Sequence, residues 1–497
     1  MSAAAAATFV AASPVVGLPA FSFLPLALLS LAIWPAVQQL RVIHTFGLGW
    51  FAGLGYAGAL FYWLLGVNVA GAVITIAGFA CLPGLFAVGI QFALKRKLSG
   101  VSFALWFASL WTSLEFIGSD NIASLPPYGL GYFWWEYPLL LQSAAWVSAY
   151  GASFVLALGN ATIALAIRKH LTRPTLALFL ACSTGLVVMG AISFADAPSI
   201  NSASEHQLKI AALRTLRSGE EKRDPQTLLD LVTLTDSLTD ITKDARPSLV
   251  VWPETAIPVS LRSYRSRELI SELLEQAKSQ NAPMLIGAHS IEVISREAPR
   301  LYNAAFLVPS SGYIDQEYRK ILLAPGVEKT VMAPYLPPAL AERWPSRLQA
   351  GNTLGLFDVD NHKLGVFICW EVFFPGFVRQ LPQQGAAALI NMSNDHAAFG
   401  DAESAYKIPL PHVVLRAIEN RRYLIRSANG GPSIAVDPYG RVAAIENGAQ
   451  ESILLTTISL QRKVTFFSQH GAVIAGIFAA GTFGWGLLLM ITSRKPV

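Results

Sequence analysis

Residues 365–371 read Gly-Val-Phe-Ile-Cys-Trp-Glu, an apolar run that ends abruptly in a thiol, an aromatic ring and a carboxylate. The pattern predicts a buried β-strand that ends at Cys369. Cys369 is the only cysteine between about residue 200 and residue 468, since Cys81 and Cys182 lie in long apolar stretches. A single thiol at the end of a buried strand is either an inert core side chain or a catalytic nucleophile.

The composition around this stretch divides the chain into apolar and charged parts. Of 497 residues, 53% are hydrophobic and 14% are charged, whereas soluble proteins carry about 25% charged residues. We therefore predict a membrane helix bundle over residues 1–197, a globular domain over 204–465 and a last membrane helix over 470–493. The net charge of +5 comes without a dense basic run, so we predict no nucleic-acid binding.

Membrane-spanning segments are predicted by length, because about 20 apolar residues cross a bilayer. The clearest candidates are residues 46–67, 70–94, 101–118, 138–167, 174–195 and 470–493. The first 40 residues are also apolar but are interrupted by prolines. They predict either one crossing or two short ones.

Basic residues in the short loops predict the orientation. The basic positions are Arg41, Lys95-Arg96-Lys97, Arg168-Lys169 with Arg173, and Arg494-Lys495. Alternating crossings place all of them on one side, the cytoplasmic side, and residues 200–468 on the other. In a bacterium the domain would then be periplasmic, in an oxidising compartment.

The charged block alternates predicted strands and helices. Strands are expected at residues 210–213, 248–252, 284–287, 302–308, 312–318, 364–369, 387–391, 424–428, 433–436 and 442–445. Helices are expected at residues 225–238, 265–280, 374–383 and 412–423. This pattern is typical of a strand-rich α/β domain of about 260 residues.

Three of these predicted strands deliver reactive groups where they end. Glu254 follows the strand at 248–252, Lys320 follows the strand at 312–318, and Cys369 ends the strand at 364–369. A carboxylate can take the thiol proton as a general base, and a lysine can stabilise the thiolate and an oxyanion. Each residue alone has an ordinary structural explanation, but together they predict nucleophilic catalysis.

Together with their neighbours, these residues resemble the nitrilase (carbon-nitrogen hydrolase) superfamily. The matching motifs are Trp252-Pro253-Glu254, Tyr318-Arg319-Lys320, Cys369-Trp370-Glu371, Asn391-Met392-Ser393-Asn394-Asp395 and residues 416–422. Because membrane segments precede and follow the domain, the chain is similar to the apolipoprotein N-acyltransferases, the membrane members of that superfamily.

The resemblance implies a fold and a reaction. The fold is a membrane α-helical bundle plus a nitrilase-type four-layer α-β-β-α sandwich, with eight transmembrane helices, which favours two crossings in the first 40 residues. A phospholipid donates an acyl chain to the cysteine, and the resulting thioester acylates the N-terminal amine of a diacylglyceryl-cysteine apolipoprotein. The implied location of this lipoprotein biosynthesis is the bacterial inner membrane, with the catalytic domain in the periplasm.

The resemblance also assigns roles to residues. Glu254 corresponds to the general base, Lys320 to the oxyanion lysine and Cys369 to the nucleophile. We expect four further residues to bind substrate or to support the site: Glu328, Trp370, Glu371 and Asn394. The implied partners are a phospholipid donor, an apolipoprotein acceptor and the lipid bilayer, and no metal or organic cofactor is implied.

Departures from the family motifs keep two alternatives open. Residues 214–219 replace a Gln-Gly-Asn or Gln-Gly-Asp turn, and residues 394–400 lack the tryptophan of the family motif. The alternatives are a divergent membrane nitrilase-like enzyme acting on another substrate, for example of the conjugal-transfer TraB type, and a non-catalytic relative. The apolar, proline-rich segment 331–338 is interpreted either as a lid that contacts lipid or as a connector.

Overall fold

The computed structural model describes residues 1–67, 69–119, 129–198, 206–218, 246–263, 266–293, 299–310, 313–314, 316–325, 327–329, 348–400 and 402–492. The predicted helix at 225–238 and the segment 331–338 lie outside the described residues. The chain forms two compact units. The first comprises residues 1–197, 410–415 and 465–497, and the second comprises residues 198–409 and 416–464.

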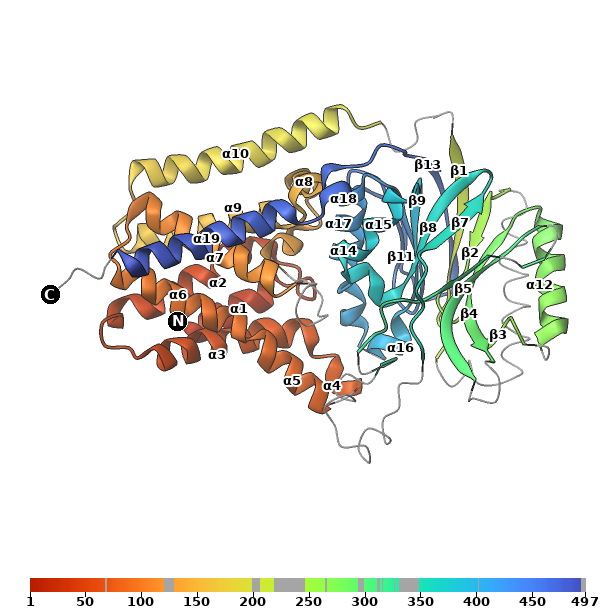
Figure 1. Ribbon diagram of the computed structural model, residues 1–497, viewed down its shortest axis with the longest axis horizontal. Coiled ribbons are helices and arrows are strands. Elements are labelled where there is room, and N and C mark those ends of the chain that lie inside the picture. The colour runs from red at the N-terminus through yellow and green to blue at the C-terminus, as the bar shows by residue number, and fades with distance from the viewer. Residues whose placement is uncertain are drawn as a thin grey trace. The chain divides into compact units, whose positions relative to one another are not determined.

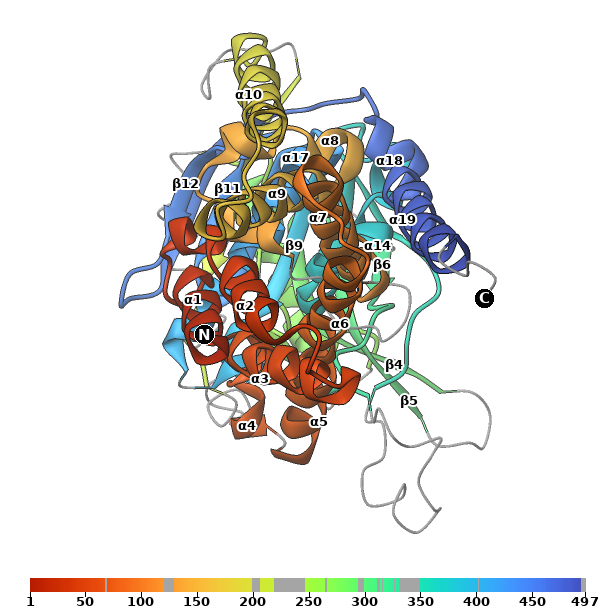
Figure 2. The same cartoon turned by 90° about the vertical axis from the view of Figure 1, so that its left-hand side faces the viewer.

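The first unit is helical (Figure 2). Its α-helices are α1 (Ser2–Ala12), α2 (Pro25–Ile33), α3 (Val42–Phe61), α4 (Leu64–Val67), α5 (Val69–Phe79), α6 (Cys81–Lys95), α7 (Gly100–Ile117), α8 (Ala144–Val147), α9 (Tyr150–Ile167), α10 (Arg173–Ala195), α18 (Phe466–His470) and α19 (Val473–Ile491). Short 3₁₀ turns lie at η1 (Pro19–Phe23), η2 (Trp34–Ala36), η3 (Leu130–Trp134) and η4 (Pro138–Leu141).

Six helical stretches among the described residues are long and apolar enough to cross a membrane. They are Pro19–Ala36, Val69–Lys95, Gly100–Ile117, Tyr150–Ile167, Arg173–Ala195 and Val473–Ile491. The chain is therefore a multi-pass membrane protein. The prediction of one continuous span over 138–167 was wrong, because η4, α8 and α9 divide it and Ser148 adopts a positive φ of 55° between α8 and α9.

Two other predicted spans differ in detail. The expected segment 46–67 begins earlier, as the 20-residue helix α3, which is not one of the six stretches above. Within the first 40 residues, Pro19–Ala36 is long enough to span, whereas α1 has 11 residues. At about 1.5 Å per residue, α1 alone is too short for a hydrocarbon core of about 30 Å.

The second unit contains two β-sheets (Figure 1). The first has the order β13-β1-β2-β4-β5-β6, with β3 also paired to β4, and the second has the order β12-β11-β10-β9-β8-β7. The strands of the first sheet are β1 (Gln207–Arg214), β2 (Leu249–Val251), β3 (Ile257–Ser260), β4 (Met284–Glu292), β5 (Arg300–Val308), β6 (Gln316–Arg319) and β13 (Ser452–Ser459). Those of the second are β7 (Gly355–Val359), β8 (His362–Ile368), β9 (Ala388–Asn394), β10 (Leu424–Asn429), β11 (Ser433–Val436) and β12 (Val442–Glu446).

Helices cover the outer face of each sheet, as Figure 1 shows. On the first sheet, Leu273 and Ala277 of α12 (Arg267–Gln280) join the core formed by β2, β4 and β5. On the second, α14 (Pro375–Val378) and α15 (Gln380–Gln383) replace the single helix predicted at 374–383. Helix α17 (Leu410–Asn420) follows β9 along the chain.

The inner faces of the two sheets meet through polar as well as apolar contacts. The Ser427 hydroxyl on β10 donates to the carbonyl of Leu213 on β1 at 2.6 Å. Thr215, just after β1, forms an isolated parallel bridge with Asn429. The predicted four-layer α-β-β-α arrangement is therefore confirmed.

Strand β13 was not predicted and completes the first sheet. It runs antiparallel to β1 along its whole length, and the pairing starts with Gln207 opposite Ser459. The first and last strands of the unit are thus neighbours in one sheet.

Parallel central strands direct their carboxyl ends to the same edge of each sheet. β1, β2 and β4 are parallel in the first sheet, and β8, β9 and β10 are parallel in the second.

Gly287 on β4 allows the loop after β2 to lie close to the sheet. A Cβ atom at this position would lie 2.3 Å from the carbonyl oxygen of Pro253 and 2.8 Å from the Cα of Glu254.

We predict that Gly287→Ala destabilises the domain by about 1–3 kcal/mol, because the methyl group must displace backbone atoms in a packed region. Thermal unfolding of the purified protein checks this expectation. Gly448→Ala is the matched control, since no atom lies within 4 Å of the Cβ position of Gly448. Equal melting temperatures for the two variants would contradict the prediction.

Candidate active site

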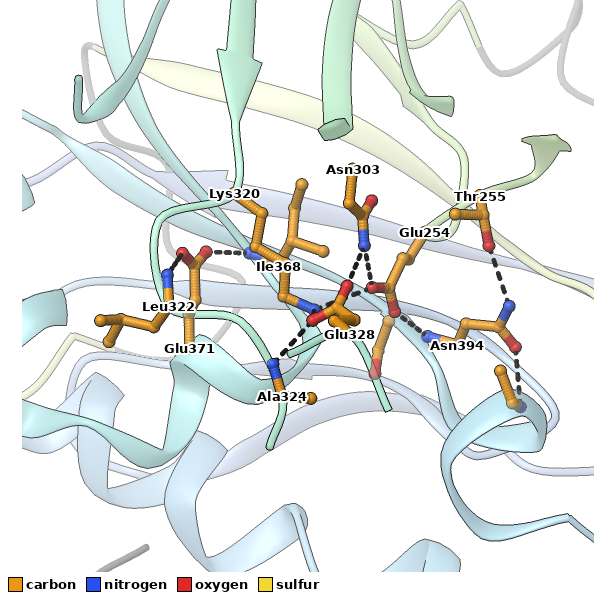
Figure 3. Close-up of polar contacts among 12 residues, drawn as sticks. Glu254, Thr255, Asn303, Lys320, Leu322, Ala324, Glu328, Ile368, Glu371 and Asn394 are labelled. Atoms are coloured by element: carbon orange, nitrogen blue, oxygen red, sulfur yellow. Dashed lines mark hydrogen bonds and ion pairs between the residues drawn. The ribbon is translucent and has the colours of Figure 1, made fainter. Parts of the chain in front are cut away.

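Glu254 and Lys320, predicted at two strand ends, meet in the second unit (Figure 3). Cys369, predicted at a third strand end, belongs to the same unit and interacts electrostatically with both of them. Glu254 follows β2, Lys320 follows β6 directly, and Cys369 follows β8 directly. β2 and the last five residues of β8 are apolar and buried, whereas β6 is polar and buries only Tyr318 of its four residues. Glu254 and Lys320 are both buried, whereas Cys369 is partly exposed.

Lys320 lies between two carboxylates. Its Nζ is 3.1 Å from Oε1 of Glu254 and 2.7 Å from Oε2 of Glu328, and its side chain is 1% exposed. Burial alone would lower the pKa of Lys320, but the charges of Glu254 and Glu328 outweigh it and hold the pKa well above its usual value. Lys320 is therefore a fixed positive charge at neutral pH.

Two asparagines orient the carboxylates (Figure 3). The Asn303 side-chain amide donates to Oε1 of Glu254 at 2.6 Å and to Oε1 of Glu328 at 2.8 Å. The backbone N–H of Asn394 donates to Oε2 of Glu254 at 2.7 Å, and its side-chain amide donates to the hydroxyl of Thr255 at 2.9 Å. Glu254 thus has partners on both oxygens, which fixes the direction of its carboxylate.

Cys369 occupies a sharp turn between a strand and a helix. It is the first residue of the 3₁₀ helix η8 (Cys369–Phe373), and its φ of 47° is uncommon for any residue other than glycine. Such strain is often found at functional positions, where the surrounding structure holds it. Here the turn stops the β8 ladder directly before the thiol.

The surroundings of Cys369 favour a protonated thiol. Its partial burial, and then the negative charge of Glu254, raise the pKa of the thiol well above its usual value, while Lys320 opposes this effect. The thiol therefore needs a base to become a nucleophile at neutral pH. The carboxylate of Glu254 is a suitable base in the same cluster.

The carboxylate of Glu371 accepts four hydrogen bonds and lies outside the cluster formed by Lys320, Glu254 and Glu328. Its Oε1 accepts from the hydroxyl of Tyr318 at 2.6 Å and from the backbone N–H groups of Ile321 and Leu322 at 2.8 and 3.0 Å. Its Oε2 accepts from the N–H of Ile368 at 2.7 Å. Burial raises the pKa of Glu371, and the donors oppose the rise. One carboxylate thus joins the segments on either side of Lys320 and Cys369.

The structure separates the remaining predicted residues into different environments. The ring of Trp370 packs against Phe373 and Phe374, at centroid distances of 5.1 and 5.9 Å, directly after the thiol. Asn394 also accepts at its Oδ1 from the side chain of Asn429 at 2.8 Å. Trp370 is therefore part of the apolar wall beside Cys369, and Asn394 belongs to the polar network of Glu254.

Asn303 was missed in the sequence although it contacts both carboxylates. It lies in β5, directly before the apolar run of residues 304–308, and its exposed fraction is 2%. A single amide in a buried strand is the signal that could have identified it, because buried polar groups need partners. Among the described residues, no group of three or more His, Cys, Asp or Glu side chains is arranged to hold a metal ion.

We predict that Glu371→Gln destabilises the domain by about 1–3 kcal/mol or more. Four groups now donate hydrogen bonds to the carboxylate of Glu371. In glutamine an NH2 group replaces one carboxylate oxygen, so at least one of these donors would face another donor. Thermal unfolding measures the effect, and Tyr318→Phe is the control because it removes one donor and leaves no donors opposed. A smaller loss of stability in Glu371→Gln than in Tyr318→Phe would refute the prediction.

Comparison with known proteins adds two family matches. The model of the carbon-nitrogen hydrolase family matches residues 210–464, which is more than half of the chain. The model of the apolipoprotein N-acyltransferase N-terminal domain matches residues 4–162.

Curated relatives match over most of the chain. A protein from Geobacter metallireducens named apolipoprotein N-acyltransferase is 27% identical over 466 residues, covering 88% of this chain and 85% of the relative. A protein of the same name from Azotobacter vinelandii is 28% identical over 492 residues, covering 94% of this chain and 91% of the relative. The solved structure of Saccharomyces cerevisiae Nit3, described as a member of branch 10 of the nitrilase superfamily, is 21% identical, with a TM-score of 0.38, and covers 52% of this chain and 93% of Nit3.

The family match coincides with the two-sheet unit that contains Glu254, Lys320 and Cys369, and the N-terminal match coincides with membrane helices. The chain therefore belongs to the carbon-nitrogen hydrolase family and carries, before that domain, a region of the apolipoprotein N-acyltransferase type.

Proposed function

We propose that this chain transfers an acyl chain from a phospholipid, through a thioester on Cys369, to the N-terminal amine of a diacylglyceryl-cysteine apolipoprotein. The observation that carries the proposal is the buried cluster of Glu254, Lys320 and Glu328 beside a thiol at a strained strand end. The six apolar helical stretches support a substrate that stays in a bilayer. The names of the relatives support the same reaction.

The first half-reaction acylates the cysteine. Glu254 accepts the proton of the Cys369 thiol as the sulfur attacks the ester carbonyl carbon of the phospholipid, and a C–S bond forms. Lys320 stabilises the negative oxygen of the tetrahedral intermediate. The ester C–O bond then breaks, and the proton on Glu254 passes to the departing alkoxide, so that a lysophospholipid leaves.

The second half-reaction returns the enzyme to its starting state. The neutral amine of the apolipoprotein attacks the thioester carbonyl, and Glu254 accepts a proton from the amine nitrogen. The C–S bond breaks as the amide forms, and Glu254 returns the proton to the sulfur. Glu328 keeps Lys320 in place, because its carboxylate binds the Lys320 amine and the backbone N–H of Ala324 at 2.8 Å.

The location follows from the same proposal. We place the chain in the bacterial inner membrane with the second unit in the periplasm, where newly exported lipoproteins are modified. The basic loops support this orientation, because Lys and Arg are enriched on the cytoplasmic side. Although disulfides form in an oxidising compartment, Cys369 is the only cysteine between about residues 200 and 468, so it has no partner for a disulfide within this stretch.

We predict that the protein, incubated with a phospholipid carrying a labelled acyl chain, acquires a hydroxylamine-sensitive label on Cys369. Cys369→Ala abolishes the label, whereas Cys182→Ala, which removes a thiol from α10, retains it. Mass spectrometry of the labelled peptide identifies the site. No label on the wild-type protein would overturn the thioester mechanism.

Production of an N-acylated lipoprotein tests the acceptor separately. In a bacterial strain depleted of its own apolipoprotein N-acyltransferase, the wild-type chain is expected to restore N-acylated lipoprotein, and Cys369→Ala is not. Thioester formation without restored N-acylation would favour a different acceptor and would overturn the lipoprotein assignment.

We predict that Glu254→Gln separates two kinds of reactivity. Without the neighbouring negative charge the pKa of the Cys369 thiol falls, so iodoacetamide modifies it several-fold faster at about pH 8, which is below the ordinary thiol pKa of about 8.5. Acyl transfer falls by about 10²–10⁴-fold because the general base is lost. Peptide mass spectrometry measures the alkylation rate.

The control for this experiment is Glu272→Gln, a substitution on the exposed side of α12. It leaves both rates unchanged. If Glu254→Gln slowed alkylation as strongly as transfer, Glu254 would not raise the pKa of the thiol, and its proposed role would be wrong.

A further inference from the structure

The side-chain amide of Asn303 is shared by two carboxylates (Figure 3). Its Nδ2 donates to Oε1 of Glu254 at 2.6 Å and to Oε1 of Glu328 at 2.8 Å. Its backbone carbonyl accepts from the N–H of Lys320 at 2.8 Å. Asn303 therefore contacts each of the three charged residues of the cluster.

Of the two Oε1 atoms, that of Glu328 accepts from this amide, and that of Glu254 accepts both from the amide and from the amine of Lys320, 3.1 Å away. Oε2 of Glu254 is held by the N–H of Asn394, and Oε2 of Glu328 by the N–H of Ala324 and the amine of Lys320. The two Oε1 atoms both approach Nδ2 of Asn303. The two hydrogens of the amide nitrogen match these two acceptors.

The charge balance explains why an amide is needed here. Glu254 and Glu328 carry two negative charges, and Lys320 supplies one positive charge. Carboxylates that share a buried site repel each other, and the usual outcome is that one of them takes up a proton. A neutral donor that binds both stabilises their ionised forms without adding a charge.

The orientation of the amide carries a cost, which shows that the two donated bonds matter. Oδ1 of Asn303 is buried and accepts no hydrogen bond among the described residues. Turning the amide over would direct this oxygen at two carboxylates, which also only accept. The observed orientation is therefore the one in which donation to the glutamates outweighs an unpaired carbonyl.

We propose that Asn303 is a positioning residue that keeps Glu254 and Glu328 ionised together, so that Glu254 remains able to accept the proton of Cys369. The inference rests on the proposed function, in which Glu254 is the general base. Asn303 itself touches neither sulfur nor substrate in this role. It acts through the two carboxylates that it bridges.

The test compares the rate of acyl-thioester formation on Cys369 in wild-type protein and three variants. Asn303→Leu removes the donor, and the rate is expected to fall about 100-fold, within the range of a lost general base. Asn303→Asp adds a third carboxylate, and the rate is expected to fall at least as far. Asn303→Asp combined with Glu328→Gln exchanges the carboxylate and the amide and restores the original charge, so the rate is expected to recover about tenfold relative to Asn303→Asp alone.

Asn391→Leu is the matched control for stability. Asn391 is a fully buried asparagine on β9. Among the described residues, its side-chain amide donates a long hydrogen bond of 3.4 Å to the carbonyl of Phe367 and none to the glutamates. Thermal unfolding of all variants shows whether each is folded. In Asn391→Leu the rate of acyl-thioester formation is expected to stay within about threefold of wild type, because the substitution leaves the general base Glu254 and its partners in place.

The outcomes separate the two proposals. If wild-type protein forms no thioester, the proposed function fails. If wild-type protein forms it and Asn303→Leu reacts as fast, the role of Asn303 is overturned. If Asn303→Asp is slow and the added Glu328→Gln brings no recovery in a folded protein, the residue has a structural role only, and the charge argument is overturned.

Discussion

The site depends on one physical constraint, which is that charges removed from water need partners. Two carboxylates and one ammonium group are buried at the edge of a sheet, and each has at least two contacts. Breaking a buried ion pair by removing one partner costs about 3–5 kcal/mol, because the remaining charge is left uncompensated. The loops that carry Glu254, Lys320 and Glu328 are therefore held as one arrangement.

The need to bring buried charges together also affects the backbone where the strands end. Cys369 itself, and Thr255 directly after Glu254, adopt unusual backbone conformations, with φ values of 47° and 46°. Hydrogen bonds from Asn394 and to Glu371 hold the chain around these positions. The regular sheets thus provide a rigid frame, and the strain is confined to the residues where the strands stop.

The sequence predicted the parts of the site that depend on local pattern. The positions of Glu254 and Cys369 could be predicted because each follows a buried apolar run closely in the chain. Lys320 could be placed because it follows the second strand of a predicted hairpin. Asn303 could not be assigned a partner in this way, since its contacts are 49 and 25 residues away in sequence. Glu371 could be named, but its hydrogen bonds to residues 318–322 depend on how β6 and β8 are placed.

The fold shows the same division between local and distant information. The two-sheet architecture agrees with the prediction, whereas β13 was missed because its pairing with β1 joins residues about 250 positions apart. The predicted span at 138–167 was wrong for the opposite reason. The segment is largely apolar, but the positive φ of 55° at Ser148 ends helix α8. Hydropathy measures composition and does not detect such a break.

The pairing of β1 with β13 has a consequence for how the chain is organised. Gln207 and Ser459 are opposite each other in the ladder, so the chain leaves the domain beside the point at which it came in. A domain whose ends are adjacent can be inserted into another structure with little disturbance of either. In the sequence, the two-sheet domain is thus inserted between helical membrane segments, and its own first and last strands pair with each other.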